Sequence, residues 1–353
     1  MNSVRVNAGR PYGVLIGRGL LARTGETALD ALGKPCAAAM LTDDTVDALY
    51  ADAVQRSLEQ SGFTVCRFAM PHGETNKNLR TWETMLDFLA AERLTRTDCV
   101  IALGGGVVGD MAGFAAASYL RGVSLIQIPT TLLAMVDSSV GGKTGLNLSA
   151  GKNLAGAFYQ PHMVLCDPDA LNTLPADVLA DGVAEAVKYG VLGDAPLFEL
   201  LSSGSWSART EEIITRCVSA KATLVEADER DTGSRQLLNL GHTLGHAIER
   251  CSGYAVSHGH AVAVGMVYAA RLASRLGLCG GEVLPQIVAA LEANRLPVSA
   301  PYAADELCAV ALSDKKRAGG TLTFVLPEAI GQCALYPVAV EKLPEMVGMA
   351  VTE

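Results

Sequence analysis

The first half of this 353-residue chain alternates short apolar runs with longer segments that have helical spacing. Alternating strands and helices form a parallel sheet whose two faces are covered, so this pattern restricts the fold more than any other feature. The predicted strands cover residues 37–41, 65–69, 100–103 and 123–128, and the predicted helices between them cover 47–60 and 79–91. We therefore predict an α/β domain at the start of the chain.

The pattern changes after about Pro175, where helical periodicity dominates. The predicted helices cover residues 180–189, 211–228, 237–250, 259–276 and 281–293, and residues 319–327 read as a strand or hairpin arm. This predicts a second, helical domain, and the cleft between two domains is the usual place for a ligand.

Composition limits the classes of function. Hydrophobic residues make up 50% of the chain and charged residues 18%, as expected for a protein with a large core. The net charge of -9 argues against a nucleic-acid partner, and neither a membrane span nor a signal core is recognisable. Nine scattered cysteines without a C-x-x-C pair are typical of a reducing compartment, so we expect a cytoplasmic protein.

A glycine-rich loop follows the predicted strand at 100–103. Its sequence, GGGVVGD at 104–110, matches G-x-G-x-x-G and leads into a helix of small residues at 111–119. Glycines at such a turn let the backbone approach a pyrophosphate at a helix N-terminus. No acidic residue ends the next strand, where Pro129, Thr130 and Thr131 stand, so we predict dinucleotide binding in an arrangement that differs from the usual Rossmann one. A tight turn without a ligand is the structural alternative.

Four of the six histidines lie close together in the sequence, namely His242, His246, His258 and His260. His242 and His246 are four residues apart, which puts them on one face of a helix. Two histidines and a carboxylate such as Glu185 form a known catalytic zinc set. The spacing alone leaves open which of the four histidines bind a metal, while the isolated His72 and His162 are expected to be structural.

Cationic residues recur in surroundings rich in glycine and small residues, which suits an anionic substrate. Taken singly, each is more often a solvated surface charge, but as a set they fit an anionic substrate. They are Lys143, Lys152, Lys188, Lys221, Arg235, Lys315 and Lys316.

Taken together, these motifs resemble the 3-dehydroquinate synthases of the shikimate pathway. The resemblance covers most of the chain in family order, in the segments GGGVVGD at 104–110, PTTLLAMVDSSVGGK at 129–143, GKN at 151–153, AEAVKYG at 184–190, NLGHTLGH at 239–246 and DKK at 314–316. It implies a Rossmann-like, nucleotide-binding α/β domain at 1–174 and an all-α, metal-binding domain at 175–353. It also implies bound NAD, Zn²⁺ or Co²⁺, and a homodimer.

The resemblance also implies roles for individual residues. The metal ligands would be Glu185, His242 and His258. Contacts with NAD would come from Asp43, His72, Gly73, Glu74, Thr75, Asn76, Lys77, Gly105, Gly106, Val107, Val108, Gly109, Asp110, Thr130, Thr131, Lys143 and Lys152, with Leu171, Asn172 and Thr173 nearby. Substrate binding and catalysis would involve His246, Asp137, Lys143, Asn153, Lys188, Lys221, Arg235, Asn239, Arg121 and one of Lys315 and Lys316.

One position departs from the family pattern. The family usually has His-Gly-Glu at the third metal ligand, whereas this chain has His258-Gly259-His260. We keep His258 as the expected ligand and expect its surroundings to differ from those in the family.

The implied substrate is a small anionic sugar phosphate, 3-deoxy-D-arabino-heptulosonate 7-phosphate. Transient oxidation by NAD, loss of phosphate, reduction and an intramolecular aldol closure would give 3-dehydroquinate without net redox change, so the enzyme would be a phosphate lyase. The alternatives are a sister sugar-phosphate cyclase, a metal-dependent alcohol dehydrogenase, and a regulator that binds metal or nucleotide without catalysis.

Overall fold

The computed structural model describes residues 1–315 and 320–352 and divides into two compact units. The first unit contains Met1–Leu174 and Cys217–Arg230, and the second contains Pro175–Arg216 and Asp231–Glu353. The segment from Cys217 covers the second half of helix α8 (Thr210–Ala227), and its side chains bond to the first unit. Glu226 accepts the backbone N–H of Asn7 at 2.7 Å, and Glu229 accepts that of Gly9 at 3.0 Å.

The first unit is built on a seven-stranded sheet with the order β1-β2-β9-β6-β5-β3-β4. Every neighbouring pair is parallel except β1 with β2, which form an antiparallel edge. Its strands are β1 (Asn2–Val6), β2 (Tyr12–Ile16), β3 (Ala37–Asp43), β4 (Thr64–Met70), β5 (Cys99–Gly104), β6 (Ser124–Pro129) and β9 (Met163–Cys166). The four strands predicted from the sequence are therefore confirmed as β3, β4, β5 and β6, and the α/β class with them.

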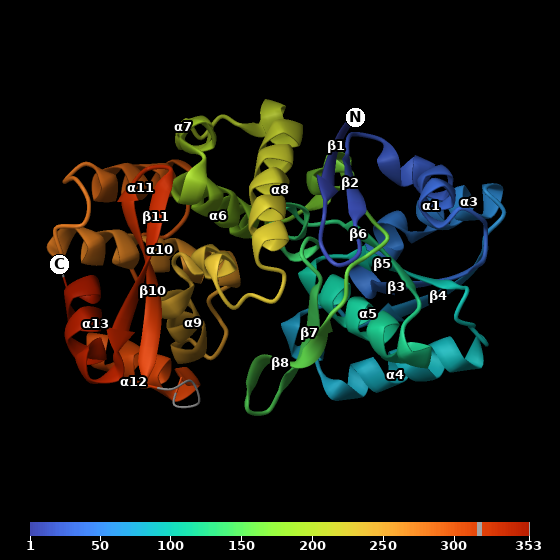
Figure 1. The fold of residues 1–353 in the computed structure, drawn as a ribbon. Helices are drawn as coiled ribbons and strands as arrows, with labels where there is room; N and C mark the ends of the chain where they lie inside the picture. Colours follow the sequence, from blue (N-terminus) through green and yellow to red (C-terminus); the bar gives the residue numbers. More distant parts are fainter. Residues whose placement is uncertain (316–319, 353) are drawn as a thin grey trace. The chain divides into compact units, whose positions relative to one another are not determined.

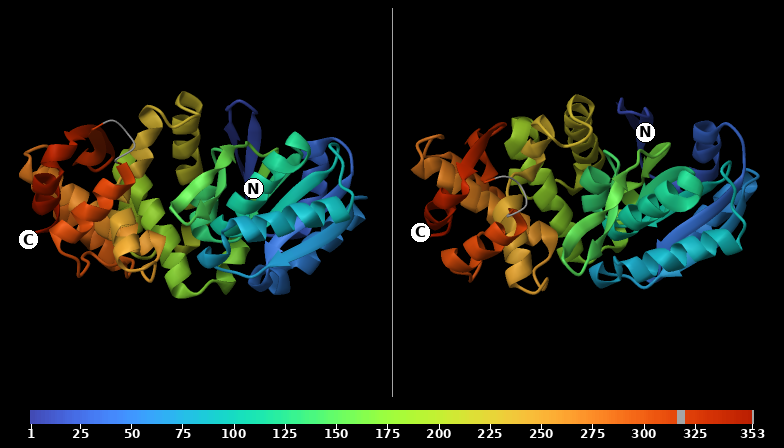
Figure 2. Two further views of the ribbon diagram at one scale, coloured as in Figure 1. Left: turned by 90° about the horizontal axis from the view of Figure 1, so that it is seen from below. Right: turned by 60° about the horizontal axis from the view of Figure 1, so that its bottom comes forward.

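Helices cover both faces of this sheet (Figure 1). Helices α1 (Thr24–Leu32) and α3 (Asp52–Gln60) lie on one face, and α4 (Leu79–Ala91) and α5 (Gly106–Ser118) lie on the other. Figure 2 shows α4 and α5 from below, in cyan and teal, in front of the strands. Their buried residues, including Met85, Leu89 and Met111, form one core with Leu41 and Val100 of the sheet. A two-stranded antiparallel hairpin, β7 (Lys143–Leu148) and β8 (Gly151–Phe158), completes the unit.

The second unit is helical with one antiparallel hairpin, β10 (Thr321–Ala329) and β11 (Gln332–Ala339). Its helices are α6 (Ala176–Gly193), α7 (Ala195–Ser202), the first part of α8, α9 (His242–Cys251), α10 (His258–Arg275), α11 (Val283–Ala293), α12 (Ala304–Lys315) and α13 (Leu343–Val351). Helix α10 is central, since thirteen of its eighteen residues are buried. No helix in the described part of the chain combines the length and apolar character that a membrane crossing needs.

Several element boundaries differ from the sequence-based prediction; the helix predicted at 180–189, for example, extends over Ala176–Gly193. The predicted helix at 237–250 begins only at His242, because Gly241 adopts a left-handed φ of 77° and a Cβ there would lie 2.7 Å from the carbonyl oxygen of Val262. The predicted helix at 111–119 begins earlier, at Gly106. Residues Asp47–Ala51 form a π-helical turn, so the regular part of the helix predicted at 47–60 is Asp52–Gln60.

Candidate functional site

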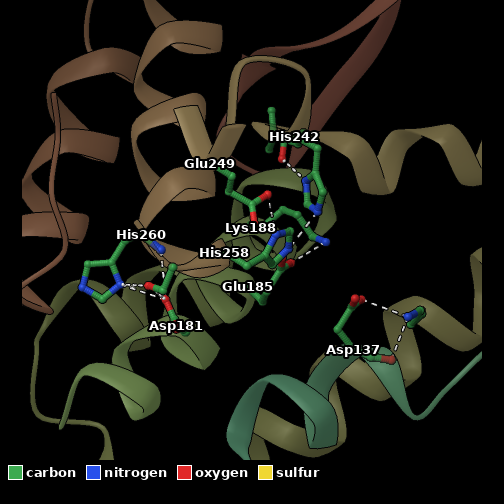
Figure 3. Close-up of polar contacts among 11 residues, drawn as sticks. Asp137, Asp181, Glu185, Lys188, His242, Glu249, His258 and His260 are labelled. Atoms are coloured by element: carbon green, nitrogen blue, oxygen red, sulfur yellow. Dashed lines mark hydrogen bonds and ion pairs between the residues drawn. The ribbon is translucent and has the colours of Figure 1, made fainter. Parts of the chain in front are cut away.

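Three histidines converge in the second unit, and Figure 3 shows two of them, His242 and His258. His242 is the first residue of α9, His246 lies one turn later, and His258 is the first residue of α10. The ring centroids are 5.3 Å apart for His242 and His246, 5.1 Å for His242 and His258, and 5.8 Å for His246 and His258. The structure therefore brings together side chains that are separated by the whole of α9 in the sequence.

Glu185 of α6 is fully buried and contacts two of these rings. Its Oε1 lies 3.1 Å from Nε2 of His258 and 3.5 Å from Nε2 of His242. Its other oxygen, Oε2, lies 2.5 Å from Nζ of Lys188, three residues later on the same helix. One carboxylate oxygen thus faces two imidazoles while the other faces a lysine.

The opposite nitrogen of each ring has its own partner. Nδ1 of His242 lies 3.0 Å from the carbonyl oxygen of Leu240, and Nδ1 of His258 lies 3.4 Å from Oε2 of the buried Glu249. Such partners fix a histidine tautomer in which Nδ1 carries the proton and Nε2 has a lone pair to offer. Two Nε2 atoms and one carboxylate oxygen that face one another fit a zinc-type metal ion.

The environment moves the pKa values of the two histidines in opposite directions. Burial lowers the pKa of His242 to about 3, so it is neutral at physiological pH, which is the form that binds a metal. Burial acts in the same direction on His258, but hydrogen bonds to Glu185 and Glu249 outweigh it and raise the pKa of His258 to about 10.

Glu249 is a residue that the sequence analysis missed. Together with His246 and His258 it forms a second group whose possible ligand atoms lie within 4.8 Å of one another. The signal in the sequence was its spacing, since Glu249 follows His246 by three residues and His242 by seven on one helix.

His260 points away from this cluster and toward Asp181 of α6 (Figure 3). Its Nδ1 lies 2.8 Å from Oδ1 of Asp181, which also accepts a hydrogen bond from Ser257 at 2.6 Å. The sequence left the choice between His258 and His260 open, and only His258 lies with Glu185 and His242. Asp181 is a second residue that the sequence analysis missed.

A cavity of about 380 Å³ opens beside the histidines within the second unit. Asn239, His242 and His246 line it, together with Asp231, which the sequence analysis did not single out. Arg235, in the 3₁₀ turn before Asn239, is 1% exposed, so the interpretation as a solvated surface charge is wrong for this residue. Lys188 is equally buried.

The glycine-rich loop lies in the first unit at the carboxyl ends of the strands. Strand β3 pairs with β4 on one side and with β5 on the other, so the loops after β3 and β5 diverge. This divergence is where doubly wound sheets bind ligands. Asp43 ends β3 and Gly104 ends β5. The sequence has no acidic residue at the end of β6, but Asp43 ends β3, the strand that pairs with β5.

Helix α5 begins at Gly106 and is capped by the backbone of Gly105 without a side chain, which leaves its first turn suited to an anion. A Cβ at Gly105 would lie 3.0 Å from Thr131, and one at Gly106 would lie 3.0 Å from Ser138. The hydroxyl of Thr130 is buried and has no hydrogen-bond partner among the described residues. Val107, Val108, Gly109 and Asp110 follow in the first turns of the helix. These features fit a dinucleotide better than a simple turn.

A buried ion pair joins the glycine-rich loop to the segment after β4. Nζ of Lys77 lies 2.6 Å from Asp110 and 2.6 Å from the amide oxygen of Asn153. Burial raises the pKa of Asp110, although Lys77 opposes the shift. The structure thus groups Asn153, expected at the substrate, with two residues expected at the cofactor.

The other predicted residues of the first unit lie on several separate segments. His72 bonds Asp44 at 2.7 Å, Gly73 has a φ of 97°, and Glu74, Thr75 and Asn76 form a 3₁₀ turn. Leu171, Asn172 and Thr173 end a second 3₁₀ turn, and Thr173 bonds Tyr50. Lys221 lies 3.0 Å from the carboxylate of Asp137. Both Lys143 and Lys152 lie on the β7–β8 hairpin. Arg121 has a left-handed φ of 67°.

The predicted substrate contacts are therefore divided between the units: Lys188, Arg235, Asn239 and His246 lie in the second, and Arg121, Asp137, Lys143, Asn153 and Lys221 lie in the first. Neither the side chain of Lys315 nor any part of Lys316 belongs to the described residues.

Solved structures define the class of protein. A 2-deoxy-scyllo-inosose synthase complexed with carbaglucose-6-phosphate, NAD⁺ and Co²⁺ matches with a TM-score of 0.87 and 26% identity, over 98% of this chain and 99% of that one. A 2-epi-5-epi-valiolone synthase from Streptomyces hygroscopicus with NAD⁺ and Zn²⁺ bound matches equally well, at 27% identity over 95% of both chains. An iron-containing alcohol dehydrogenase from Thermotoga maritima shares the fold alone, at 16% identity and a TM-score of 0.66 over 96% of this chain and 97% of that one. The fold and the His/Glu cluster thus define the class that contains the sugar-phosphate cyclases.

Sequence relatives narrow this class. Family models described as 3-dehydroquinate synthase N-terminal and C-terminal match residues 67–181 and 182–317. A 3-dehydroquinate synthase of Streptococcus suis is 45% identical over 96% of this chain and 97% of its own length, and one of Caulobacter vibrioides is 46% identical over 91% of each. The chain belongs to the 3-dehydroquinate synthase family.

Proposed function

We propose that this protein is a 3-dehydroquinate synthase that converts 3-deoxy-D-arabino-heptulosonate 7-phosphate to 3-dehydroquinate and phosphate. The reaction oxidises one alcohol of the substrate, eliminates phosphate, reduces the ketone again and closes the ring by an intramolecular aldol step. Since there is no net redox change, the enzyme is a phosphate lyase of the shikimate pathway. The identity of about 45% to curated 3-dehydroquinate synthases over nearly the full length carries this proposal.

We propose Glu185, His242 and His258 as the residues that hold Zn²⁺ or Co²⁺. The nucleotide would lie along the glycine-rich loop, with its pyrophosphate against Gly105 and Gly106. When bound, NAD supplies reversible hydride exchange at the substrate alcohol, and the metal ion lowers the pKa of that alcohol. Two observations support this assignment: both Nε2 atoms face one carboxylate oxygen, and the Thr130 hydroxyl is buried without a protein partner.

The chain's own residues orient the substrate. The buried guanidinium of Arg235 presents a planar pair of N–H donors suited to the substrate carboxylate, and Asn239 lines the same cavity as His246. Imidazole exchanges protons near neutral pH, so we assign proton transfer during elimination and ring closure to His246. Lys188 compensates the negative charge of Glu185. Arg121, Lys143 and Asn153 are proposed to bind the phosphate end and the sugar of the substrate.

We further propose that residues 1–174 bind the nucleotide, that 175–353 bind metal and substrate, and that the enzyme is a cytoplasmic homodimer. None of the nine cysteines, all of which lie in the described part of the chain, forms a disulfide, in keeping with a reducing compartment. Light scattering of the purified protein tests the dimer.

A turnover assay tests the proposed activity. The purified enzyme with zinc and NAD should release one phosphate for each heptulosonate phosphate consumed, without accumulating NADH. Stoichiometric NADH would instead indicate a dehydrogenase. Faster phosphate release from sedoheptulose 7-phosphate or glucose 6-phosphate would indicate a sister cyclase, and no turnover of any substrate would favour a binding protein.

A further inference from the structure

The first turn of α10 is capped by a residue of another helix. Ser257 occupies the N-cap position, but its side chain makes no capping bond to its own helix. Its hydroxyl donates instead to Oδ1 of Asp181 on α6, at 2.6 Å. The same oxygen accepts the backbone N–H of His260 at 3.0 Å, which is the N–H that an N-cap side chain ordinarily binds.

The carboxylate of Asp181 also holds the side chain of His260. Nδ1 of His260 lies 2.8 Å from Oδ1 of Asp181 and 2.8 Å from Oγ of Ser257. A negative charge at the N-terminus of a long helix is further stabilised by the helix dipole. Asp181 therefore binds the start of α10 through one backbone and two side-chain groups.

The two helices approach each other closely at this point. A Cβ on Gly259 would overlap the backbone of Asp181, so glycine is needed between His258 and His260. On α6, Asp181 precedes Glu185 by four residues, which is about one turn, and both side chains lie on one face. The contact between Asp181 and His260 is thus adjacent to the pair of Glu185 and His258.

We propose that Asp181 is a positioning residue for the metal centre: by capping α10 from α6, it holds the imidazole of His258 opposite the carboxylate of Glu185. This inference rests on the proposed function, because it assumes that Glu185 and His258 bind the metal. The contacts of Asp181 are with Ser257 and His260, and not with the ligand atoms of Glu185 or His258. Without the carboxylate of Asp181, the imidazole of His258 should be held less firmly opposite Glu185. Metal binding should then weaken by about 10- to 100-fold, the range typical for loss of a residue that supports a metal ligand.

The test compares Asp181→Ala and Asp181→Asn with Asp194→Ala. Asp194 is the control for general stability: at the end of α6 its carboxylate caps α7 by accepting the backbone N–H of Leu197 at 3.0 Å and also binds Arg216 at 2.9 Å, and none of these partners is a proposed metal ligand. For each full-length protein, the zinc dissociation constant is measured by competition with a chelator, the cobalt absorption spectrum is recorded, and the thermal unfolding of the metal-free form is followed.

We expect Asp181→Ala to bind zinc about 10- to 100-fold more weakly and to change the cobalt spectrum. Asp181→Asn should recover part of the affinity, because its amide oxygen still accepts the N–H of His260. Asp194→Ala should lower the unfolding temperature while it leaves zinc affinity and the cobalt spectrum unchanged.

Unchanged zinc affinity in both Asp181 variants would overturn the inference. Equal losses of affinity in Asp181→Ala and Asp194→Ala would also overturn it, since the effect would then be one of general stability. Should Asp181→Ala fail to fold, the affinity of Asp181→Asn decides alone. Failure of the unsubstituted enzyme to bind zinc would instead overturn the proposed function, and this inference with it.

Discussion

Nζ of Lys188 lies 2.5 Å from Oε2 of Glu185, and both side chains are almost completely buried. The pair spans one turn of α6, and the other oxygen of Glu185 faces the imidazoles of His242 and His258. Lys188 therefore neutralises a carboxylate that would be costly to bury alone.

Replacing Lys188 by Met should destabilise the metal-free protein. Removing one partner of a buried ion pair leaves the other charge poorly compensated, so the free energy of unfolding should fall by roughly 3 kcal/mol. Zinc should raise the stability of the variant more than that of the unsubstituted protein, because the ion restores positive charge beside Glu185. Urea unfolding with and without zinc measures both effects, with Lys188→Arg as the control that keeps the charge. An unchanged unfolding free energy would show that Lys188 is not needed to balance Glu185.

Replacing His242 by Ala should remove the metal. The variant loses one of the two Nε2 atoms that face Glu185, so the zinc content after dialysis should fall to near zero and turnover should be lost with it. His260→Ala should still bind one zinc per chain, although more weakly through the loss of its contact with Asp181. Metal analysis distinguishes the two variants. Full zinc occupancy in His242→Ala would disprove the proposed ligand set.

Replacing Gly106 by Val should prevent nucleotide binding. A Cβ at Gly106 would lie 3.0 Å from the Ser138 hydroxyl. The larger side chain of valine would also fill the space at the start of α5 that a pyrophosphate requires. Calorimetry should detect no NAD binding to a variant whose circular dichroism is unchanged. Gly348→Val is the control, since a Cβ on Gly348 meets nothing within 4 Å. Normal NAD affinity in Gly106→Val would mean that the loop is only a turn.

Replacing Arg235 by Lys should impair use of the carboxylate-bearing substrate. Lysine keeps the charge but cannot present two parallel N–H donors, and the misaligned charged hydrogen bond costs on the order of 1.5 to 3 kcal/mol. We expect a higher KM, a lower kcat, and a fall in kcat/KM of roughly 10- to 100-fold. Steady-state phosphate release measures all three. Near-normal kinetics, or equal turnover of sedoheptulose 7-phosphate by the unsubstituted enzyme, would move the assignment to a sister cyclase.

Acid should destabilise the first unit through His162. Burial, together with the nearby charge of Arg10, lowers the pKa of His162 to about 4, whereas an unfolded histidine titrates near 6.5. Between these values the unfolded chain binds the extra proton, so the unfolding free energy should fall as the pH drops from about 6.5 to 4. His162→Gln should remove this part of the pH dependence. The prediction would be contradicted if the unfolding free energies of the two proteins changed equally with pH between about 6.5 and 4.

Much of the first unit could be predicted from the sequence because its signals are local. Residues in central parallel strands are buried on both faces and read as apolar runs, which located β3, β4, β5 and β6. Strand β1 lies at an exposed edge and shows no apolar run, whereas β9 is a buried apolar run of four residues that the sequence analysis did not pick out. The start of α9 was misplaced because the left-handed conformation of Gly241 depends on its contact with α10.

The sequence by itself determined the chemistry that this protein has available: a glycine-rich turn after a strand, histidines one helical turn apart, and a carboxylate and a lysine on one helix. These follow from residue type and spacing, which act over a few residues. Only the tertiary structure decided that Nε2 of His258 meets Glu185, 73 residues away, and that His260 turns to Asp181. It also revealed Glu249 and Asp181 as the supporting acids. The physical reason is that these contacts depend on how α6, α9 and α10 pack, and packing between distant segments leaves no local pattern in the chain.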